Sequence, residues 1–228
     1  MARFLVLLDV DSTLIENEVI ELLAAEAGSL AEVESITFRA MNGELDFEES
    51  LRARVATLKG LPVSVFETVA RHVTVTAGVD ELIATVRAAS GRIAVVSGGF
   101  HEVLDPFAER LGLDYWRANR LEVADGLLTG GLTGPIIDAQ AKADTLREWA
   151  ADSEVPLSRT VAVGDGANDL PMMAIAGLAV ECAPAFEQRH QDQGDGEGHE
   201  VIDQPVQQQR GSDPVGATDA NRATYEHA

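Results

Sequence analysis

Three short apolar runs, each followed at once by polar residues, set the pattern of this chain. They cover residues 3–8, 93–96 and 160–163. Unbroken runs of this length are typical of strands that are buried on both faces of a parallel sheet. Segments with helical spacing separate the runs, and this alternation predicts an α/β fold with a doubly wound parallel sheet core.

Residues 15–73 break the alternation, because they carry helical periodicity and no strand pattern. The expected helices cover about 15–27, 29–41, 47–59 and 62–72. Asp46, with Glu49 three residues later, forms a capping box that marks the start of the third helix. We therefore expect an all-helical cap over residues 15–73, inserted into an α/β core made of residues 1–14 and 74–186.

Strand and helix patterns alternate again after residue 74, and the composition then changes after Phe186. Further helices are expected at about 79–89, 100–111, 140–151 and 170–176, and turn signals within 119–137 predict a hairpin. Residues 187–228 contain no Leu, Met, Phe or Trp and hold seven of the chain's eight Gln. Such a segment buries too little apolar surface to offset its ordering entropy, so we expect a disordered tail.

Composition and charge exclude several classes of function. The 228 residues carry a formal net charge of -21, which disfavours binding to nucleic acids and to anionic membranes. Cys182 is the only cysteine, so no internal disulfide can form, as is usual in a reducing compartment. Since no apolar run approaches the ~18 residues that span a bilayer, we expect a cytoplasmic protein, either a monomer or a homodimer.

Polar residues that suit phosphate chemistry follow each of the three predicted strands. They are Asp9, Asp11 and Thr13 after the first, Ser97, Gly98 and Gly99 after the second, and Asp165, Asn168 and Asp169 after the third. Taken singly, each cluster is also consistent with an ordinary turn or helix cap. The carboxyl ends of parallel strands meet at one edge of a sheet, where ligands bind. Together with Lys142, the clusters offer oxygen ligands for Mg²⁺, donors for phosphate and one cation, which is the set that phosphoryl transfer requires.

These motifs carry a family resemblance. Asp-x-Asp-x-Thr at 9–13, the strand-end Ser97, Lys142 and Gly164-Asp-Gly-Ala-Asn-Asp are similar to the four motifs of haloacid-dehalogenase-like phosphatases. Ala40-Met-Asn-Gly-Glu-Leu-Asp-Phe, Ser50-Leu-Arg-Ala-Arg-Val and Ser97-Gly-Gly-Phe resemble the phosphoserine phosphatase branch of that superfamily, over about residues 4–180. The resemblance implies a core with a helical cap inserted after the first strand.

The resemblance also implies catalytic roles for the matching carboxylates. Asp9 is similar to the nucleophile that forms an aspartyl-phosphate, and Asp11 to the general acid that later activates water. The implied ligands of Mg²⁺ are Asp9, Asp165 and the backbone carbonyl of Asp11. Asp169 is implied behind them, orienting the ligands.

A second set of residues is implied in substrate binding. Around the phosphoryl group these are Ser97, Gly98, Lys142 and Asn168. On the cap, Glu18 is implied to meet a substrate ammonium and Arg54 a carboxylate, while Met41 and Phe47 line the apolar side of the pocket. Without the resemblance, Glu18 and Arg54 fit a solvated helix face equally well.

The function that this resemblance implies is Mg²⁺-dependent hydrolysis of O-phospho-L-serine to L-serine and phosphate, in serine biosynthesis. Two alternatives stay open, namely action on another small phosphomonoester, including transfer to another alcohol, and an inactive, partly folded relative. The second arises because relatives carry a further strand and helix beyond Gly177 that are not recognisable here. A natural extension and a shifted reading frame are both open as its origin. Either predicts low stability or self-association, with protease sensitivity from about residue 187.

Overall fold

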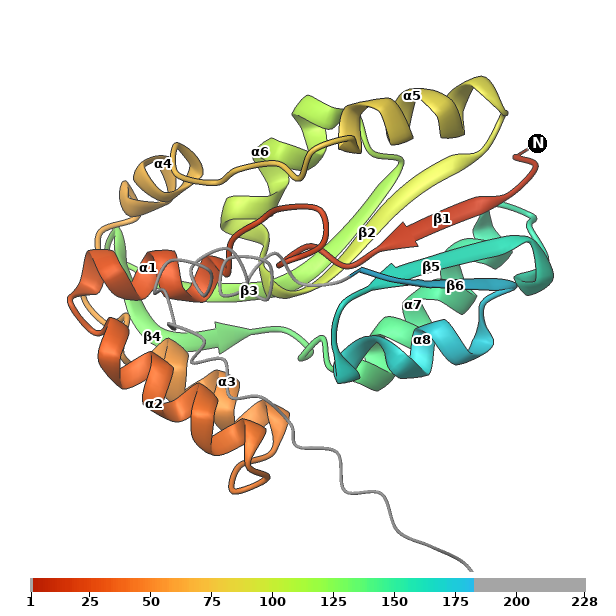
Figure 1. The fold of residues 1–228 in the computed structure, drawn as a ribbon. Coiled ribbons are helices and arrows are strands. Elements are labelled where there is room, and N and C mark those ends of the chain that lie inside the picture. Colours follow the sequence, from red (N-terminus) through yellow and green to blue (C-terminus); the bar gives the residue numbers. More distant parts are fainter. Residues whose placement is uncertain (1, 183–228) are drawn as a thin grey trace, which may run out of the picture.

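A six-stranded sheet forms the centre of the computed structural model, which describes residues 2–182 (Figure 1). The strand order is β4-β3-β2-β1-β5-β6. The strands are β1 (Leu5–Leu8), β2 (Arg92–Phe100), β3 (Tyr115–Ala124), β4 (Leu127–Thr133), β5 (Thr160–Gly164) and β6 (Leu178–Glu181). All neighbouring strands are parallel except β3 and β4, which form the expected antiparallel hairpin. The predicted α/β fold class is confirmed.

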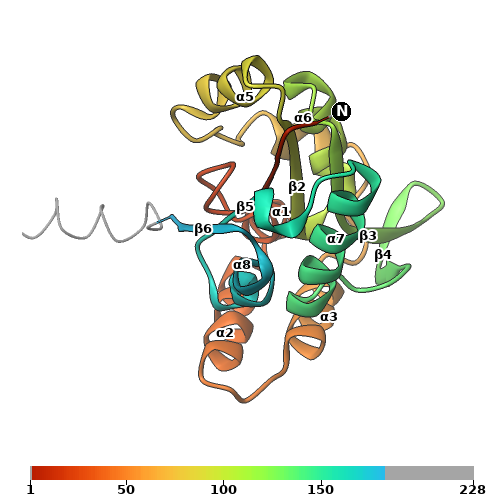
Figure 2. The same cartoon turned by 90° about the vertical axis from the view of Figure 1, so that its right-hand side faces the viewer.

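The described residues form eight helices. They are α1 (Val19–Ala27), α2 (Leu30–Met41), α3 (Phe47–Ala56), α4 (Val65–Ala70), α5 (Val79–Ala88), α6 (His101–Leu111), α7 (Ala139–Asp152) and α8 (Leu170–Ile175). Single 3-10 turns occupy Leu157–Arg159 and Ala167–Asp169. Figures 1 and 2 show α5 and α6 on one side of the sheet and α7 and α8 on the other. Within residues 2–182, every helix is too short or too polar to cross a membrane.

The alternation of side chains along β1 explains why the sheet needs helices on both faces. Leu5 and Leu7 belong to the apolar cluster under α7 and α8, whereas Val6 and Leu8 belong to the cluster that includes α5 and α6. β1 lies between β2 and β5 in parallel register. The carboxyl ends of these three strands therefore meet, and α1 to α4 lie beyond those ends at the left of Figure 1.

The first helix after β1 begins at Val19, later than the periodicity predicts, because residues just before it bond to the segment at 74–75 instead. Ile15 forms an antiparallel bridge with Val75, and the N–H of Glu16 donates to the carbonyl of Thr74 over 2.9 Å. The chain leaving the core and the chain returning to it are thus bonded to each other. α4 is also shorter than expected, while the capping box at Asp46 is present as predicted.

The β3–β4 hairpin is bonded to the segment between α3 and α4. The N–H of Gly60 donates to the carbonyl of Leu128 over 2.8 Å, and the N–H of Leu128 donates to Leu61 over 2.8 Å. A third hydrogen bond runs from the N–H of Val63 to the carbonyl of Gly126 over 3.0 Å. These backbone bonds join the inserted helices to the sheet at a point far from the two connecting segments.

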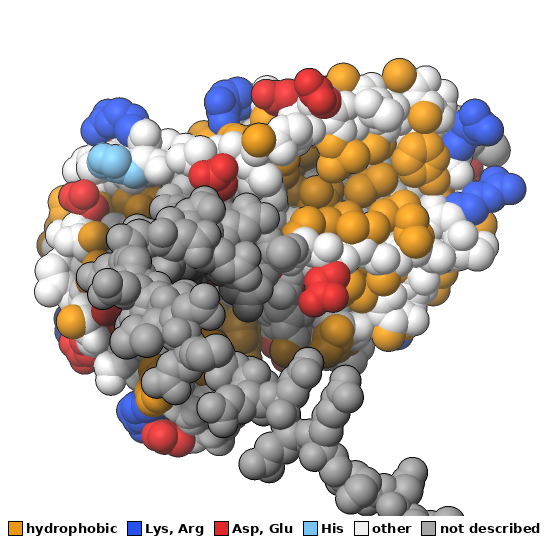
Figure 3. All heavy atoms as spheres, in the orientation of Figure 1, with side chains coloured by type: hydrophobic (Ala, Val, Ile, Leu, Met, Phe, Trp, Pro, Cys, Tyr) orange, Lys and Arg blue, Asp and Glu red, His pale blue; other side chains and the backbone are white. Residues whose placement is uncertain are grey.

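The edge strand β6 corrects the sequence analysis, which recognised no strand after Gly177. β6 pairs with β5 and places Leu178 and Val180 beside Val161 and Val163, on the α5 side of the sheet. Leu178 is 56% exposed and Val180 is 40% exposed. Figure 3 shows hydrophobic side chains gathered on this face, over the strands below α5. The predicted tail lies outside the described residues, and low stability or self-association stays a prediction.

Candidate active site

A cavity of about 760 Å³ lies at the carboxyl ends of β1, β2 and β5, facing the inserted helices. Ten of the residues singled out in the sequence line it: Asp9, Asp11, Glu18, Met41, Phe47, Arg54, Gly98, Gly99, Asp165 and Asn168. Three others, Ser97, Lys142 and Asp169, are almost completely buried beside it. The sequence motifs thus converge on one place in the fold.

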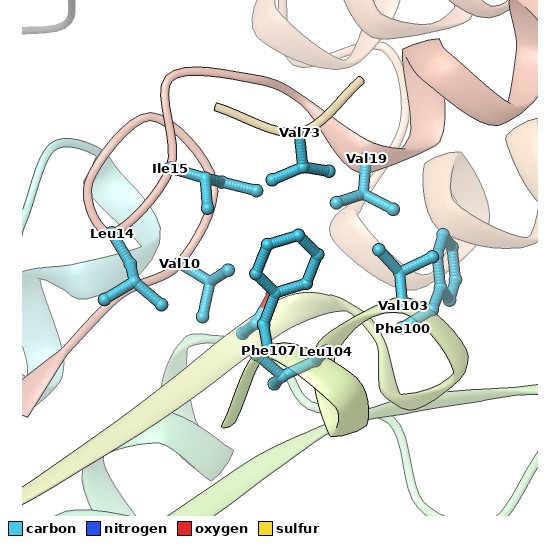
Figure 4. Close-up of a pocket in the computed structure, with 10 residues that line it drawn as sticks. Val10, Leu14, Ile15, Val19, Val73, Phe100, Val103, Leu104 and Phe107 are labelled. Carbon is cyan, nitrogen blue, oxygen red and sulfur yellow. The ribbon is translucent and has the colours of Figure 1, made fainter. Parts of the chain in front are cut away.

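The loop after β1 brings two carboxylates to this cavity within three residues. Ser12 adopts a left-handed backbone conformation with φ of 56°, and the N–H groups of Thr13 and Ile15 both donate to the carbonyl of Val10. This tight turn lets Asp9 and Asp11 both line the cavity. A small apolar cavity of about 10 Å³ lies behind the loop, where Val10 and Ile15 face Phe107 of α6 (Figure 4). Its size and lining fit packing of the loop, not ligand binding.

Asp9 and Asp169 share one buried cation. Lys142, on the first turn of α7, places Nζ 2.7 Å from Oδ1 of Asp9 and 2.7 Å from Oδ1 of Asp169. Burial would lower the pKa of Lys142, but the charges of Asp9 and Asp169 outweigh it and leave that pKa raised. Burial raises the pKa of Asp9 to about 7, against the opposing charge of Lys142. One ammonium group therefore serves two buried carboxylates.

The same carboxylates form a candidate metal site with Asp165. Asp9, Asp165 and Asp169 each offer an oxygen, and these atoms lie within 4.8 Å of one another. Oδ2 of Asp169 also accepts the backbone N–H groups of Asp165 and Gly166 over 3.2 Å each, which fixes the loop that carries Asp165. Burial raises the pKa of Asp165, and the charge of Asp169 adds to the effect. An excess of carboxylate oxygens over cations suits a hard divalent metal ion.

Glycine is required where Asp169 packs against β5. A Cβ atom on Gly164 would lie 2.4 Å from Cγ of Asp169, much closer than real contacts allow. A side chain at this position would displace the carboxylate that orients Lys142 and Asp165. Gly164, which opens the fourth motif, is therefore required for a steric reason that the sequence alone does not reveal.

Asp11 is held differently from Asp9. Its Oδ1 accepts the backbone N–H of Val19 at the start of α1 over 3.0 Å, and its Oδ2 accepts Oγ of Ser97 over 3.3 Å. Burial raises the pKa of Asp11, although the Val19 N–H opposes this by favouring the carboxylate. Asp11 thus connects the core to the first inserted helix, and its raised pKa suits a group that exchanges protons.

Asn119 is a buried residue at the site that the sequence analysis missed. Its Nδ2 donates to the carbonyl of Gly98 over 2.8 Å, and its Oδ1 accepts the N–H of Ile137 over 2.8 Å. Asn119 is 1% exposed and fixes the end of β2 against the segment that precedes α7. A lone amide in a β-prone run gives no local signal for such a role, because both of its partners are distant in the sequence.

The inserted helices supply both signs of charge to the cavity. Ser12 Oγ donates to Oε1 of Glu18 over 2.9 Å, and burial together with the charge of Asp11 raises the pKa of Glu18 to about 8. Burial lowers the pKa of Arg54, and nearby carboxylates, Glu18 first, oppose the shift. Among residues 2–182, the hydrogen bond found for the Arg54 side chain is a long one of 3.4 Å, from Nε to the carbonyl of Ser50. The Arg54 guanidinium is therefore available to an anionic ligand.

Phe47 and Met41 differ in how far they enter the site. The Phe47 ring lies 3.2 Å from the position that a Cβ on Gly98 would take, so the start of α3 touches the end of β2. Met41 is 82% exposed and borders the mouth of the cavity. Phe47 therefore closes the apolar side of the cavity more directly than Met41 does.

Comparison with known proteins agrees with this geometry. The family model for haloacid dehalogenase-like hydrolases matches residues 6–174, and the chain belongs to this family. It is 55% identical over 179 residues to the phosphoserine phosphatase of Streptomyces coelicolor, covering 78% of this chain and 44% of that protein. It is 50% identical over 176 residues to the phosphoserine phosphatase of Streptococcus thermophilus, covering 77% of this chain and 82% of that protein.

A solved structure gives the same result in three dimensions. The phospho-aspartyl intermediate analogue of a phosphoserine phosphatase superposes with a TM-score of 0.75 at 44% identity, covering 83% of this chain and 91% of that chain. The chain spans less than half the length of the Streptomyces relative but most of the Streptococcus relative. The similarity therefore covers both the core and the inserted helices described here.

Proposed function

We propose that this chain is a Mg²⁺-dependent phosphatase that hydrolyses O-phospho-L-serine to L-serine and phosphate. The observation that carries the proposal is the cavity itself, which is lined both by the Asp9 and Asp11 carboxylates that follow β1 and by Glu18 and Arg54 from the segment inserted between β1 and β2. The names of the two bacterial relatives and of the solved structure support the same substrate. We propose the cap as residues 15–73 and the core as residues 1–14 with 74–186.

In the first half of the reaction, a carboxylate oxygen of Asp9 attacks phosphorus in line with the seryl oxygen. The bond from phosphorus to the seryl oxygen breaks as the bond to Asp9 forms, and Asp11 transfers its proton to the departing oxygen. Lys142 holds the attacking carboxylate in place through the 2.7 Å hydrogen bond to Oδ1. The raised pKa of Asp11 supports its part as the proton donor.

In the second half, water attacks the phosphorus of the aspartyl-phosphate. Asp11 accepts a proton from this water, the bond between phosphorus and Asp9 breaks, and phosphate leaves with Asp9 again a carboxylate. Ser97 and the backbone at Gly98 are proposed to hold the phosphoryl oxygens together with Lys142, and Asn168 lines the cavity beside them. These donors stabilise the charge that builds on the phosphoryl group.

The donor set fits a magnesium ion, since Asp9, Asp165 and Asp169 offer only oxygen atoms at a partly buried site. We propose Asp9, Asp165 and the backbone carbonyl of Asp11 as ligands, with Asp169 orienting Asp165 through the backbone bonds described above. When bound, Mg²⁺ supplies positive charge that favours the ionised form of Asp9 and screens its repulsion from the phosphate.

Glu18 and Arg54 are proposed to bind the amino-acid part of the substrate. Arg54 pairs with the carboxylate, which a guanidinium binds with two parallel hydrogen bonds, and Glu18 pairs with the ammonium group. Phe47 covers the apolar side of the bound ester. A zwitterionic substrate requires both charges, and this requirement separates phosphoserine from simple phosphate esters.

The test is phosphate release from a panel of phospho-amino acids and sugar phosphates, with Mg²⁺ and with a chelator. Phosphoserine should be the preferred substrate, and activity should depend on the metal. Release from sugar phosphates at a higher kcat/KM would favour the alternative of another small phosphomonoester. No release from any ester, by a protein whose fold is intact, would refute the proposal.

A further inference from the structure

A second carboxylate, Glu21, lines the same cavity as Glu18. Glu18 is the N-cap residue that precedes α1, in an extended backbone conformation, and Glu21 lies in the first turn of the helix. Glu21 is half-buried and lines the cavity, as Glu18 does. Nothing in the motifs that identify the family assigns a role to Glu21.

The charge balance of the cavity gives Glu21 a consequence for binding. The charged residues that line it are Asp9, Asp11, Glu16, Glu18, Glu21, Asp165 and Arg54. The structure describes all of these lining residues, and Arg54 is the only cation among them. Glu21 and Arg54 line the same cavity. Burial raises the pKa of Glu21, and Glu34 adds to this shift while Arg54 opposes it.

We propose that Glu21 is a specificity-determining residue, the second negative charge that makes this pocket prefer phosphate esters carrying an ammonium group. The inference rests on the proposed function, because it concerns the amino-acid end of the same substrate. Glu21 adds a second carboxylate beside Glu18 to a lining whose one cation is Arg54. A bound ammonium group favours the ionised forms of both carboxylates, whereas an ester that has a carboxylate but no amine meets only their repulsion.

The test compares three small phosphomonoesters that carry different combinations of these charged groups. Phosphoserine carries both groups, phosphoethanolamine has the ammonium group alone, and phosphoglycolate has the carboxylate alone. Glu21→Gln should lower kcat/KM about 3- to 10-fold for the two amines, mainly through KM, as expected for loss of one partly buried charge. The same variant should raise kcat/KM for phosphoglycolate, so the ratio between amine and non-amine substrates changes more than either rate.

A matched control is available on the same helix. Glu26→Gln removes the same charge from an exposed position of α1 that does not line the cavity. It should leave all three substrates in their original order, and the Tm of both variants should match that of the parent. This control separates a local effect in the pocket from the change in net charge of the whole protein.

The outcomes distinguish the role of Glu21 from the proposed phosphoserine phosphatase activity on which it rests. If the parent is active and the Glu21→Gln and Glu26→Gln variants have the same substrate ratios, the role of Glu21 is refuted and the proposed function is not. Equal losses on all three substrates in Glu21→Gln also refute it, since they indicate a structural effect. A folded parent that releases no phosphate from phosphoserine refutes the proposed function, and the inference falls with it.

Discussion

Replacement of Lys142 by Met should destabilise the metal-free protein more than any other single change of a charged side chain at the site. The ammonium is 1% exposed and bonds to both Asp9 and Asp169 at 2.7 Å, and those carboxylates are at most 6% exposed. Removing one partner of a buried ion pair costs about 3–5 kcal/mol, because the other charge is left uncompensated. This is a large part of the roughly 5–15 kcal/mol that stabilises a typical domain.

The pH dependence of that loss follows from the pKa of Asp9. Burial raises it to about 7 in the folded state, above its ordinary value. A protonated Asp9 needs no counter-charge, so the loss in Lys142→Met should be smaller near pH 5, where it comes from the lost pairing with Asp169. As pH rises through about 7, Asp9 ionises and the full loss appears. A divalent cation at the carboxylate cluster replaces the missing positive charge, and Mg²⁺ should therefore restore part of the stability at about pH 8.

Urea unfolding measures this directly, at about pH 5 and pH 8, with a chelator and with Mg²⁺. Lys59→Met is the matched control, since Lys59 is exposed and its removal should change the free energy of unfolding little. A Lys142→Met protein as stable as the parent at pH 8 in chelator would show that Asp9 and Asp169 are not held as charged groups by this lysine.

Three further predictions concern activity and metal binding. Asp9→Asn should lower phosphate release by several powers of ten while Tm stays near the parent value, because the covalent route is lost but the packing is kept; turnover within tenfold of the parent would contradict the assignment. Arg54→Ala should lower kcat/KM on phosphoserine by about 10- to 150-fold relative to phosphoethanolamine, the effect of losing a charge-assisted contact; equal losses on both would show that Arg54 does not read the carboxylate. Mg²⁺ should raise Tm more at about pH 8 than at pH 6, because it competes with the proton on Asp9, whose pKa is raised to about 7 by burial; a shift independent of pH would place the metal elsewhere.

Sequence reasoning located the parts of the site that follow directly from strands. Asp9, Ser97 and Asp165 were predicted near one another because each sits at or just beyond the end of a buried apolar run, and parallel strands bring such ends together. The burial of Lys142 between two carboxylates was not predicted, because it depends on the direction in which this long side chain extends from α7. Periodicity gives the position of a residue on an element, but it does not give the direction of a long side chain.

Other features escaped prediction because their partners are remote in the chain. The start of α1 depends on a bridge between Ile15 and Val75, and Asn119 acts through Gly98 and Ile137. β6 was missed because it is only four residues long and lies close to the polar segment that begins at residue 187. The start of α1 and the role of Asn119 were missed because long-range contacts decide them.

The backbone bonds between the β3–β4 hairpin and the segment after α3 determine how this protein can admit a ligand. Gly60, Leu61 and Val63 are bonded to the hairpin, so the inserted helices are held to the core at a second place besides the connections at 15–18 and 73–76. Opening either breaks these bonds or bends the hairpin with the helices. Asn119 lies in β3, the first strand of the hairpin, and its side-chain amide donates to the carbonyl of Gly98, which lines the cavity. Movement of the inserted helices is therefore coupled, through the hairpin and Asn119, to the backbone at Gly98 that is proposed to bind the phosphoryl group.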